Sequence, residues 1–219
     1  MRTASCYERG FDMVQRGVLI VISGFSGAGK GTVVKEITRR NENIALSVSM
    51  TTRSPREGEV NGREYFFVSK DEFEKAIEND ELVEYANYVG NYYGTPKKYV
   101  EDMLSSGRDV ILEIETQGAL QIKKKFPDAV LVFVTTPSFE VLKSRLVGRG
   151  TESEEVISNR LRKAGEETQY MMQYDFVLVN DVLEKTIEDM NTIINASHKA
   201  PACNEVFINK IIEDFKAYR

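Results

Sequence analysis

The sequence has little of what stabilises disulfide-rich or zinc-dependent proteins. It contains two cysteines, Cys6 and Cys203, near opposite ends of the chain, and one histidine, His198. Two distant thiols do not make a disulfide framework, and no cysteine or histidine has the spacing of a zinc ligand. Since no acidic or nucleophilic partner is visible near His198, we expect it to lie at the surface.

Long apolar runs are also missing. No stretch reaches the roughly 20 residues that a membrane-spanning helix needs, and residues 1–15 lack the apolar centre of a signal peptide. We therefore expect no membrane partner and a cytoplasmic location. The polar residues 1–16 are predicted to be a disordered N-terminal extension, with the functional chain beginning near Met13.

An excess of positive charge is absent as well. The 29 lysines and arginines are outnumbered by 34 aspartates and glutamates, so the formal net charge is −5. A general positive field that would attract nucleic acid is excluded, and we expect no nucleic-acid partner. A chain of 219 residues with 42% apolar residues can bury a sizeable core, as one large domain or as one domain with an insertion.

What the sequence does contain is a glycine-rich turn between a strand pattern and a helix pattern. An apolar run at 18–22 precedes the turn, and a helical pattern beginning at Val33 follows it. This context is typical of a phosphate-binding loop, whose backbone N–H groups and helix N-terminus surround an anion. Lys30 supplies a positive charge for the terminal phosphates of a nucleoside triphosphate. The predicted triphosphate-binding residues are Gly24, Phe25, Ser26, Gly27, Ala28, Gly29, Lys30, Gly31 and Thr32.

One position departs from the usual loop pattern. A serine or threonine normally follows the lysine and binds Mg²⁺, but here Gly31 follows and Thr32 comes one place later. We therefore expect no direct protein ligand for the metal, with Mg²⁺ held mainly by phosphates and water. The alternative is a glycine-rich turn that binds no ligand.

The remaining chain alternates strand and helix patterns. Continuous apolar runs occur at 110–114, 130–134 and 176–179, in addition to 18–22. Helical patterns lie between and after them, at 31–40, 116–125, 138–147, 153–173 and 182–197. Strands that are apolar on both faces and separated by helices predict a parallel sheet covered by helices, which is a three-layer α/β core.

Residues 48–95 interrupt this alternation. Strand-like segments at 64–68 and 82–89 flank a helical pattern at 70–78. A serine followed three residues later by glutamate predicts a capping box at the start of that helix. We expect a small β-rich insertion that faces the phosphate loop, because ligands of parallel sheets bind beyond the carboxyl ends of the strands.

The tail, residues 198–219, has apolar residues at helical spacing after Pro201. This pattern predicts a helix that packs on the core. A helix that binds a partner is the alternative.

The insertion contains a second group suited to an anion. Arg53 and Arg56 lie three residues apart among hydroxyl-bearing residues and glycines, and arginine donates paired hydrogen bonds that fit a phosphate dianion. Tyr65 can donate a further hydrogen bond to the same group. A solvated charged loop is the alternative, but the phosphate loop elsewhere in the chain favours an acceptor-phosphate site.

Taken in order, these motifs resemble those of the guanylate kinase family over residues 17–197. The resemblance rests on the phosphate loop, on residues 47–66, and on Glu84-Tyr-Ala, Gly90-Asn-Tyr-Tyr-Gly-Thr95, Ile111–Gly118, Arg145–Thr151, Asn159-Arg160-Leu161 and Val179-Asn180-Asp181. Several motifs in the family's order are more specific than a phosphate loop alone. The resemblance implies a guanylate kinase-like domain at 17–197, with a core at 17–47 and 96–197, a GMP-binding insertion at 48–95 and a helical lid at about 138–165.

The resemblance also implies which residues bind the acceptor, GMP. Its phosphate would contact Arg53, Arg56, Tyr65 and Tyr93, and its guanine would contact Ser49, Glu84 and Thr95. An ionised Glu84 matches the adjacent N1–H and amino donors of guanine, whereas adenine presents an acceptor at N1. Glu115 stands where the family usually has aspartate, near the place where Mg²⁺ and guanine would meet, and Glu113 faces the same side of the strand.

For the donor, the family pattern implies a lid whose arginines, Arg145, Arg149 and Arg160, close over the triphosphate. An exposed helix with ion pairs to nearby glutamates is the alternative, and it is what we expect for Arg162. Asn180 is similar to the residue that contacts the adenine of ATP.

The implied reaction is transfer of the γ-phosphoryl group of ATP to GMP or its deoxy form, giving ADP and GDP, in guanine nucleotide synthesis and recycling. The resemblance thus predicts ATP as co-substrate, Mg²⁺ as cofactor, and a monomer or homodimer. The second pKa of a phosphate ester is about 6, so the acceptor is largely dianionic at neutral pH and attacks without a general base. Catalysis then consists of alignment and charge stabilisation. The predicted catalytic residues are Lys30, Arg53, Arg145, Arg149 and Arg160.

Two other functions fit parts of the sequence. A scaffold module of this fold would bind a protein or peptide without catalysis, but the phosphate loop of such relatives is typically damaged, whereas this loop is intact. Another small kinase with a phosphate loop would act on AMP, dTMP or a phosphorylated sugar. The set of Ser49, Glu84 and Thr95 favours guanine instead.

Overall fold

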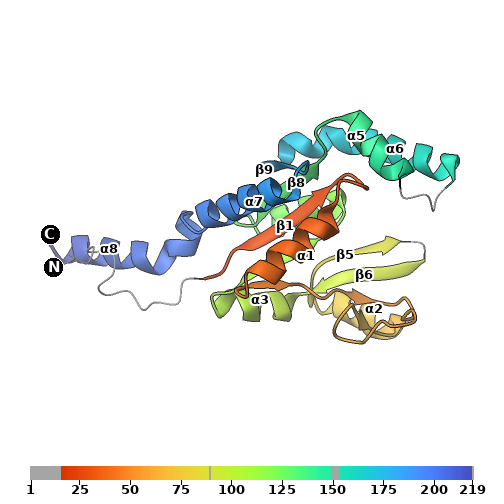
Figure 1. Cartoon of the computed structure of the whole chain (residues 1–219). Coiled ribbons are helices and arrows are strands. Elements are labelled where there is room, and N and C mark those ends of the chain that lie inside the picture. Colours follow the sequence, from red (N-terminus) through yellow and green to blue (C-terminus); the bar gives the residue numbers. More distant parts are fainter. Residues whose placement is uncertain (1–15, 89, 149–152, 219) are drawn as a thin grey trace.

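A parallel five-stranded sheet forms the centre of the molecule (Figure 1). The structure, a computed structural model, describes residues 16–88, 90–148 and 153–218. The strands lie in the order β2–β7–β1–β8–β9, and each neighbouring pair is parallel. Their bounds are β1 (Leu19–Gly24), β2 (Ile44–Leu46), β7 (Asp109–Glu113), β8 (Val130–Thr135) and β9 (Phe176–Val179).

Helices cover both faces of this sheet because its central strands are apolar on both sides. In β1, Ile20 and Ile22 pack with residues of α1 and α7, whereas Leu19 and Val21 pack with residues of α3 and α4. Burying such a side chain contributes about 1.5–3 kcal/mol relative to leaving it exposed. The helices are α1 (Lys30–Arg40), α3 (Lys97–Ser105), α4 (Thr116–Lys125) and α7 (Leu183–Ser197). The predicted three-layer α/β core is confirmed.

A second, smaller sheet has the strand order β4–β3–β6–β5. It consists of β3 (Met50–Thr51), β4 (Phe66–Phe67), β5 (Leu82–Tyr88) and β6 (Asn91–Pro96). The helix α2 (Lys70–Glu78) begins with the predicted capping box, in which the Ser69 hydroxyl accepts a hydrogen bond from the Glu72 N–H. Phe73 of α2 stacks on Tyr92 of β6, with ring centroids 5.2 Å apart, in a small core of its own. The stretch is β-rich, as predicted.

Two further helices, α5 (Phe139–Val147) and α6 (Glu154–Glu167), follow β8. In Figure 1 this pair and the strands β5 and β6 extend toward the same end of the molecule. The helix predicted at 153–173 is two elements, because α6 gives way to a 3₁₀ helix at Thr168–Gln173. No helix within the described residues is long and apolar enough to cross a membrane.

Several short elements were not predicted correctly from the sequence. Strands β2 and β3 have three and two residues, too few to show a periodicity. Of the strand predicted at 64–68, only the two residues of β4 form a strand. The strand predicted at 82–89 is β5, which ends at Tyr88, and Val89 lies outside the described residues. The extension predicted at 1–16 lies outside them too, apart from Arg16.

The prediction that the tail packs on the core is wrong. After a 3₁₀ turn at Pro201–Asn204, helix α8 (Glu205–Ala217) contains no buried residue. Phe215 is 71% exposed, and Figure 1 shows α8 reaching away from the sheet, at the opposite end of the molecule from α6. Apolar spacing correctly predicted a helix, but it does not specify which surface covers that helix.

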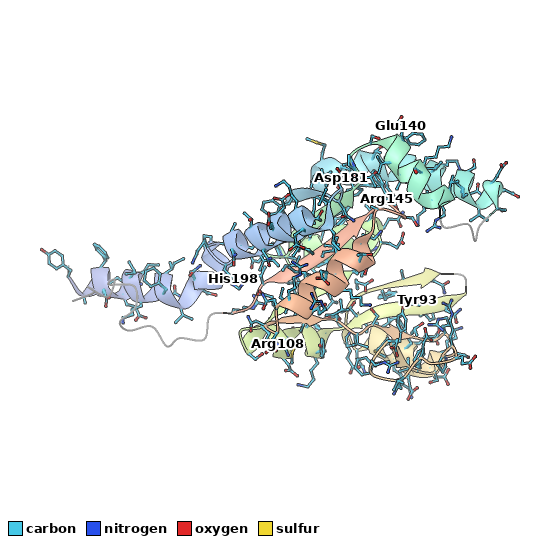
Figure 2. The ribbon with its side chains drawn as sticks, viewed as in Figure 1. Tyr93, Arg108, Glu140, Arg145, Asp181 and His198 are labelled. Carbon is cyan, nitrogen blue, oxygen red and sulfur yellow. The ribbon has the colours of Figure 1, made fainter. Side chains whose placement is uncertain are left out.

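The side chain of His198 is 23% exposed, but the expectation that it has no acidic partner is wrong. His198 ends α7 (Figure 2), and its Nε2 lies 3.0 Å from Oδ2 of the buried Asp109 at the start of β7. The other oxygen of Asp109 accepts a hydrogen bond of 2.8 Å from the Val18 N–H, just before β1. The partner was not visible in the sequence because 89 residues separate the two side chains. Asp109 therefore joins α7, β1 and β7 at the end of the sheet remote from the carboxyl ends of the strands.

Replacing Asp109 by alanine should lower the free energy of unfolding by about 1–3 kcal/mol, because a buried N–H loses its acceptor. His198→Ala should cost less, about 0.5–1.5 kcal/mol, since the buried Val18 N–H keeps its acceptor. Urea denaturation measures both. Asp102→Ala is the matched control, because Asp102 pairs with Lys98 one turn away on the exposed face of α3. Equal losses in all three variants would contradict the role given to Asp109.

Candidate functional site

The turn after β1 has a backbone shape that glycine alone adopts easily. Gly24 has a φ of 137°, and a Cβ there would lie 2.0 Å from the carbonyl oxygen of Val134 in β8. Gly29, with a φ of 88°, directly precedes α1. Both angles lie in the region that disfavours side chains, so the chain turns sharply from β1 into α1. The N-terminus of α1, where helix N–H groups can face an anion, therefore lies beyond the carboxyl end of β1.

Lys30 folds back over this turn. Its Nζ donates to the carbonyl oxygen of Gly24 at 2.7 Å and to that of Phe25 at 3.2 Å. Burial lowers the pKa of Lys30, and the nearby carboxylate of Glu113 opposes that shift. The ammonium group is thus placed by the loop's own carbonyl groups, beside the N-terminus of α1.

Asn180 supports the same turn from the end of β9. Its Nδ2 donates to the carbonyl oxygen of Ala28 at 2.8 Å, and its Oδ1 accepts from the hydroxyl of Thr186 in α7 at 3.2 Å. The residue is buried. Both ends of the amide are therefore engaged, and the contact with adenine stays a prediction.

Two of the predicted lid arginines already contact the turn. Arg145 of α5 (Figure 2) donates to the Ala28 carbonyl oxygen at 3.4 Å. Arg160 of α6 donates to the Ser26 hydroxyl through Nη2 at 2.6 Å and Nε at 3.1 Å. Arg149 lies outside the described residues. Helices α5 and α6 thus bring positive charge to the loop from a distant part of the sequence.

The second predicted anion group is built around Arg53. Its Nη2 bonds both carboxylate oxygens of Glu59, at 2.9 and 3.0 Å, and its guanidinium lies 5.4 Å from the ring centroid of Tyr65. The Tyr65 ring meets that of Tyr93 edge to face at 5.9 Å. Arg56 is exposed, and its backbone N–H donates to Glu59 at 2.7 Å. Glu59 was not indicated by any sequence pattern, and the hydrogen bond from Arg53 holds its pKa below the ordinary range.

Glu84 on β5 is a buried carboxyl group. Its Oε1 accepts a hydrogen bond of 2.8 Å from the hydroxyl of Thr95 on β6, which is also buried. Burial raises the pKa of Glu84, and the hydrogen bond from Thr95 partly offsets the rise. Within the described part of the chain, Oε2 accepts no hydrogen bond, and Gly118 leaves open the space beside it. A buried, half-satisfied carboxyl is costly and marks a place where a ligand can supply donors.

Several of these groups line one cavity of about 900 Å³. The predicted residues that line it are Lys30, Ser49, Tyr65, Glu84, Tyr93 and Glu115. Arg53 does not line the cavity itself but contacts the ring of Tyr65, which does. Thr95 likewise donates a hydrogen bond to Glu84 in the cavity wall. Arg145, Arg160 and Asn180 instead contact the loop. The structure therefore brings the loop lysine and the Glu84 carboxyl to the walls of one space.

Charged lining residues that were not assigned from the sequence include Glu113, Lys163 and Glu167. Burial raises the pKa of Glu113, and the charge of Lys30 partly offsets this rise. A Cβ on Gly31 would lie 3.7 Å from a carboxylate oxygen of Glu113, so this carboxylate faces the position where the usual loop hydroxyl is missing. Strand alternation did place Glu113 on the same side as Glu115, and Lys163 follows Arg160 by one helical turn.

A parallel sheet, a glycine-rich turn with its lysine at the carboxyl end of β1, and a cavity that extends from this lysine to the small sheet are typical of a kinase that uses a phosphate loop. Comparison with known proteins agrees, since the family model described as guanylate kinase matches residues 16–197. The chain belongs to the guanylate kinase family, and it is a kinase. The resemblance found in the sequence is confirmed.

Individual relatives show how close the similarity is. The chain is 56% identical to a guanylate kinase of Lactococcus lactis over 186 residues, which is 85% of this chain and 91% of the relative. It is 51% identical to one of Halalkalibacterium halodurans over 184 residues, covering 84% and 90%. The crystal structure of guanylate kinase from Anaplasma phagocytophilum superposes with a TM-score of 0.68 at 33% identity, covering 86% of this chain and 89% of that one.

The loop geometry predicts opposite results for two glycine-to-alanine changes. At Gly29 a Cβ would lie 2.5 Å from Nδ2 of Asn180 at a positive φ. We expect Gly29→Ala to cost about 1–3 kcal/mol of stability and to weaken nucleoside triphosphate binding at least about tenfold. At Gly165 in α6 nothing lies within 4 Å, so Gly165→Ala should add about 0.5–1 kcal/mol and leave binding unchanged. Thermal unfolding and calorimetric titration measure both; equal effects would contradict the loop geometry.

Proposed function

We propose that this chain catalyses Mg²⁺-dependent transfer of the γ-phosphoryl group of ATP to the phosphate of GMP, or of dGMP, giving ADP and GDP. The observation that carries this proposal is the buried Glu84, held by Thr95 in the wall of the cavity that also contains Lys30. We assign the reaction to guanine nucleotide synthesis and recycling in the cytoplasm, by a monomer or homodimer.

Guanine suits Glu84 because it presents an N1–H and an amino group side by side. An ionised carboxylate accepts both, through the oxygen that Thr95 leaves available and the remaining lone pairs of the other. Adenine offers an acceptor at N1, which would leave the carboxylate unpaired in a buried site. Such a site discriminates by factors of about 10⁴–10⁵ against a base that cannot satisfy its polar groups. Ser49, Thr95 and Glu115 complete the proposed guanine contacts.

The acceptor phosphate is assigned to the basic group on the small sheet. Arg53 and Arg56 supply charge, and Tyr65 and Tyr93 supply phenolic hydroxyl groups. The pairing of Arg53 with Glu59 fixes the guanidinium in place before the phosphate arrives. Fixed donors of this kind stabilise a charged group without reorganising at the moment of reaction.

The donor triphosphate is assigned to the loop, residues 24–32. Its N–H groups and Lys30 surround the β- and γ-phosphates, and Arg145 of α5 and Arg160 of α6 approach the same loop. Arg149 is assigned to the same role from the family resemblance alone. Asn180 holds the loop and is assigned to the adenine side. The dianionic acceptor attacks the γ-phosphorus in line, and the arginines and Lys30 stabilise the charge on the transferring group.

The residues near Lys30 suit Mg²⁺ bound through phosphates and water. When bound, the ion neutralises charge on the β- and γ-phosphates. Within the described residues no cluster of three or more aspartate, glutamate, histidine or cysteine side chains could hold a metal directly. A single carboxylate, Glu113, faces the space above Gly31, and carboxylate oxygen is the ligand type that Mg²⁺ and its waters prefer. Glu113 would therefore accept hydrogen bonds from the ion's water molecules.

The domain division belongs to the same proposal. We assign the core to residues 17–47 and 96–197, the GMP-binding insertion to 48–95 and the lid to about 138–165. Because the arginines act most strongly when water is excluded, the insertion and the lid would close on the two nucleotides.

A coupled assay of ADP release tests the proposal. ATP and Mg²⁺ are supplied with GMP, dGMP, AMP, CMP, UMP or dTMP in turn, using the wild type and Lys30→Met. We expect turnover with GMP and dGMP alone, reduced at least about 10³-fold in the variant, because the loop lysine stabilises the transition-state charge. Turnover confined to another monophosphate would refute the assignment of guanine, and turnover that survives in Lys30→Met would refute the role of the loop.

The state of ionisation of Glu84 predicts a pH dependence. Since burial raises the pKa of Glu84 and guanine needs the ionised form, the KM for GMP should rise as the pH falls through that raised value. Thr95→Val removes the hydrogen bond that lowers the pKa, so the rise should begin at a higher pH. Glu84→Gln should abolish this pH dependence and lower the preference for GMP over AMP at least about 100-fold. An unchanged preference would contradict the assignment.

The same substitution has a predicted effect on stability. A carboxyl group whose pKa is raised by folding contributes stability at low pH that is lost as the pH rises through the folded-state value. Above the raised folded-state pKa of Glu84, Glu84→Gln should therefore be at least as stable as the wild type in urea denaturation. A loss of GMP preference in a stable variant separates recognition from misfolding.

A further inference from the structure

Lys163 of α6 is a charged residue of the cavity wall that the proposed mechanism does not use. Its Nζ lies 2.5 Å from Oε2 of Glu115, which precedes the first residue of α4. The two residues are 48 positions apart in the sequence and line the same cavity. The ion pair therefore spans from the predicted lid to the wall where guanine is proposed to bind.

Helix α6 contacts both halves of the site through one face. Arg160 donates to Ser26 in the phosphate-binding loop, and Lys163, three residues later, pairs with Glu115. Residues three apart on a helix project in similar directions. Helix α6 is thus held against the loop by Arg160 and against Glu115, on the proposed guanine side of the cavity, by Lys163.

We propose that Lys163 is a positioning residue for the acceptor, which fixes the carboxylate of Glu115 for contact with the guanine base. The inference rests on the proposed function and deepens it. Glu115 is 70% exposed at its side chain and carries one more methylene than aspartate, so without a partner it would sample several rotamers. Holding Oε2 leaves Oε1 and a further lone pair for the base, because a carboxylate can accept about four hydrogen bonds.

The strength of this pair depends on the nucleotide. With the Lys163 side chain 51% exposed, the pair is solvated in the empty cavity and contributes little to stability. Bound nucleotides displace water from the cavity, which strengthens each electrostatic contact that remains. Removal of the Lys163 charge should therefore weaken acceptor binding and leave the free energy of unfolding almost unchanged. It also makes binding of guanine by Glu115 conditional on the position of α6.

The test compares Lys163→Met, Lys163→Arg and the wild type in steady-state kinetics and in calorimetric titration with GMP. We expect Lys163→Met to raise the KM and the Kd for GMP about three- to tenfold, the range for loss of one charged contact. The kcat and the KM for ATP should stay within about twofold, and Lys163→Arg should restore most of the affinity for GMP. Lys185→Met is the matched control, because Lys185 pairs with exposed Asp189 on α7.

A double-mutant cycle with Glu115→Gln tests whether Lys163 affects GMP binding through Glu115. In the Glu115→Gln background, Lys163→Met should have no further effect on the Kd for GMP. An unchanged or lowered Kd in Lys163→Met, a loss confined to kcat, or a loss of equal size in the Glu115→Gln background would each overturn the inference. Urea denaturation of each variant confirms that it is folded. Wild-type protein that neither binds nor phosphorylates GMP would instead refute the proposed function itself.

Discussion

The site depends on how the carbonyl oxygens of the phosphate-binding loop are bound. Lys30 donates hydrogen bonds to the carbonyl oxygens of Gly24 and Phe25. Asn180 and Arg145 donate to the carbonyl oxygen of Ala28. A peptide carbonyl and the N–H of the same peptide unit point in opposite directions, so fixing the carbonyl groups toward protein donors leaves N–H groups directed at an anion. The donors come from the loop's own helix, from α5 and from the end of β9. The sheet and its helices thus determine the geometry of a turn of a few residues.

Removal of water is the common cause of the unusual ionisation in the cavity. Burial raises the pKa of Glu84 and of Glu113 and lowers the pKa of Lys30. Each shift means that the charged form costs stability in the empty protein. The proposed substrates supply what these groups lack, with donors for Glu84 and anions for Lys30. Features that weaken the empty fold are therefore the features that would favour binding, as is usual where a functional site departs from local rules.

Local patterns predicted the parts of the fold that depend on neighbours in the sequence. Apolar runs located β1, β7, β8 and β9, and the glycine-rich turn with Lys30 located the loop. Pairings between distant residues could not be predicted in this way, because no periodicity connects Asp109 with His198 or Glu115 with Lys163. Helix α8 shows the same limit, since its spacing indicates an apolar face without saying what covers it. Family resemblance indicated Glu84 and Thr95, but burial and their hydrogen bond came from the structure alone.

The central claim is that a buried carboxylate distinguishes guanine, and the ionisation of Glu84 tests it most directly. The carboxyl carbon of Glu84 can be followed by NMR over pH in glutamate-labelled protein, with Glu84→Gln identifying the signal. Two donors from guanine favour the ionised form. Saturating GMP should therefore keep Glu84 ionised to a lower pH than in the empty protein, and AMP should leave its titration unchanged. Identical titrations with and without GMP would contradict the account.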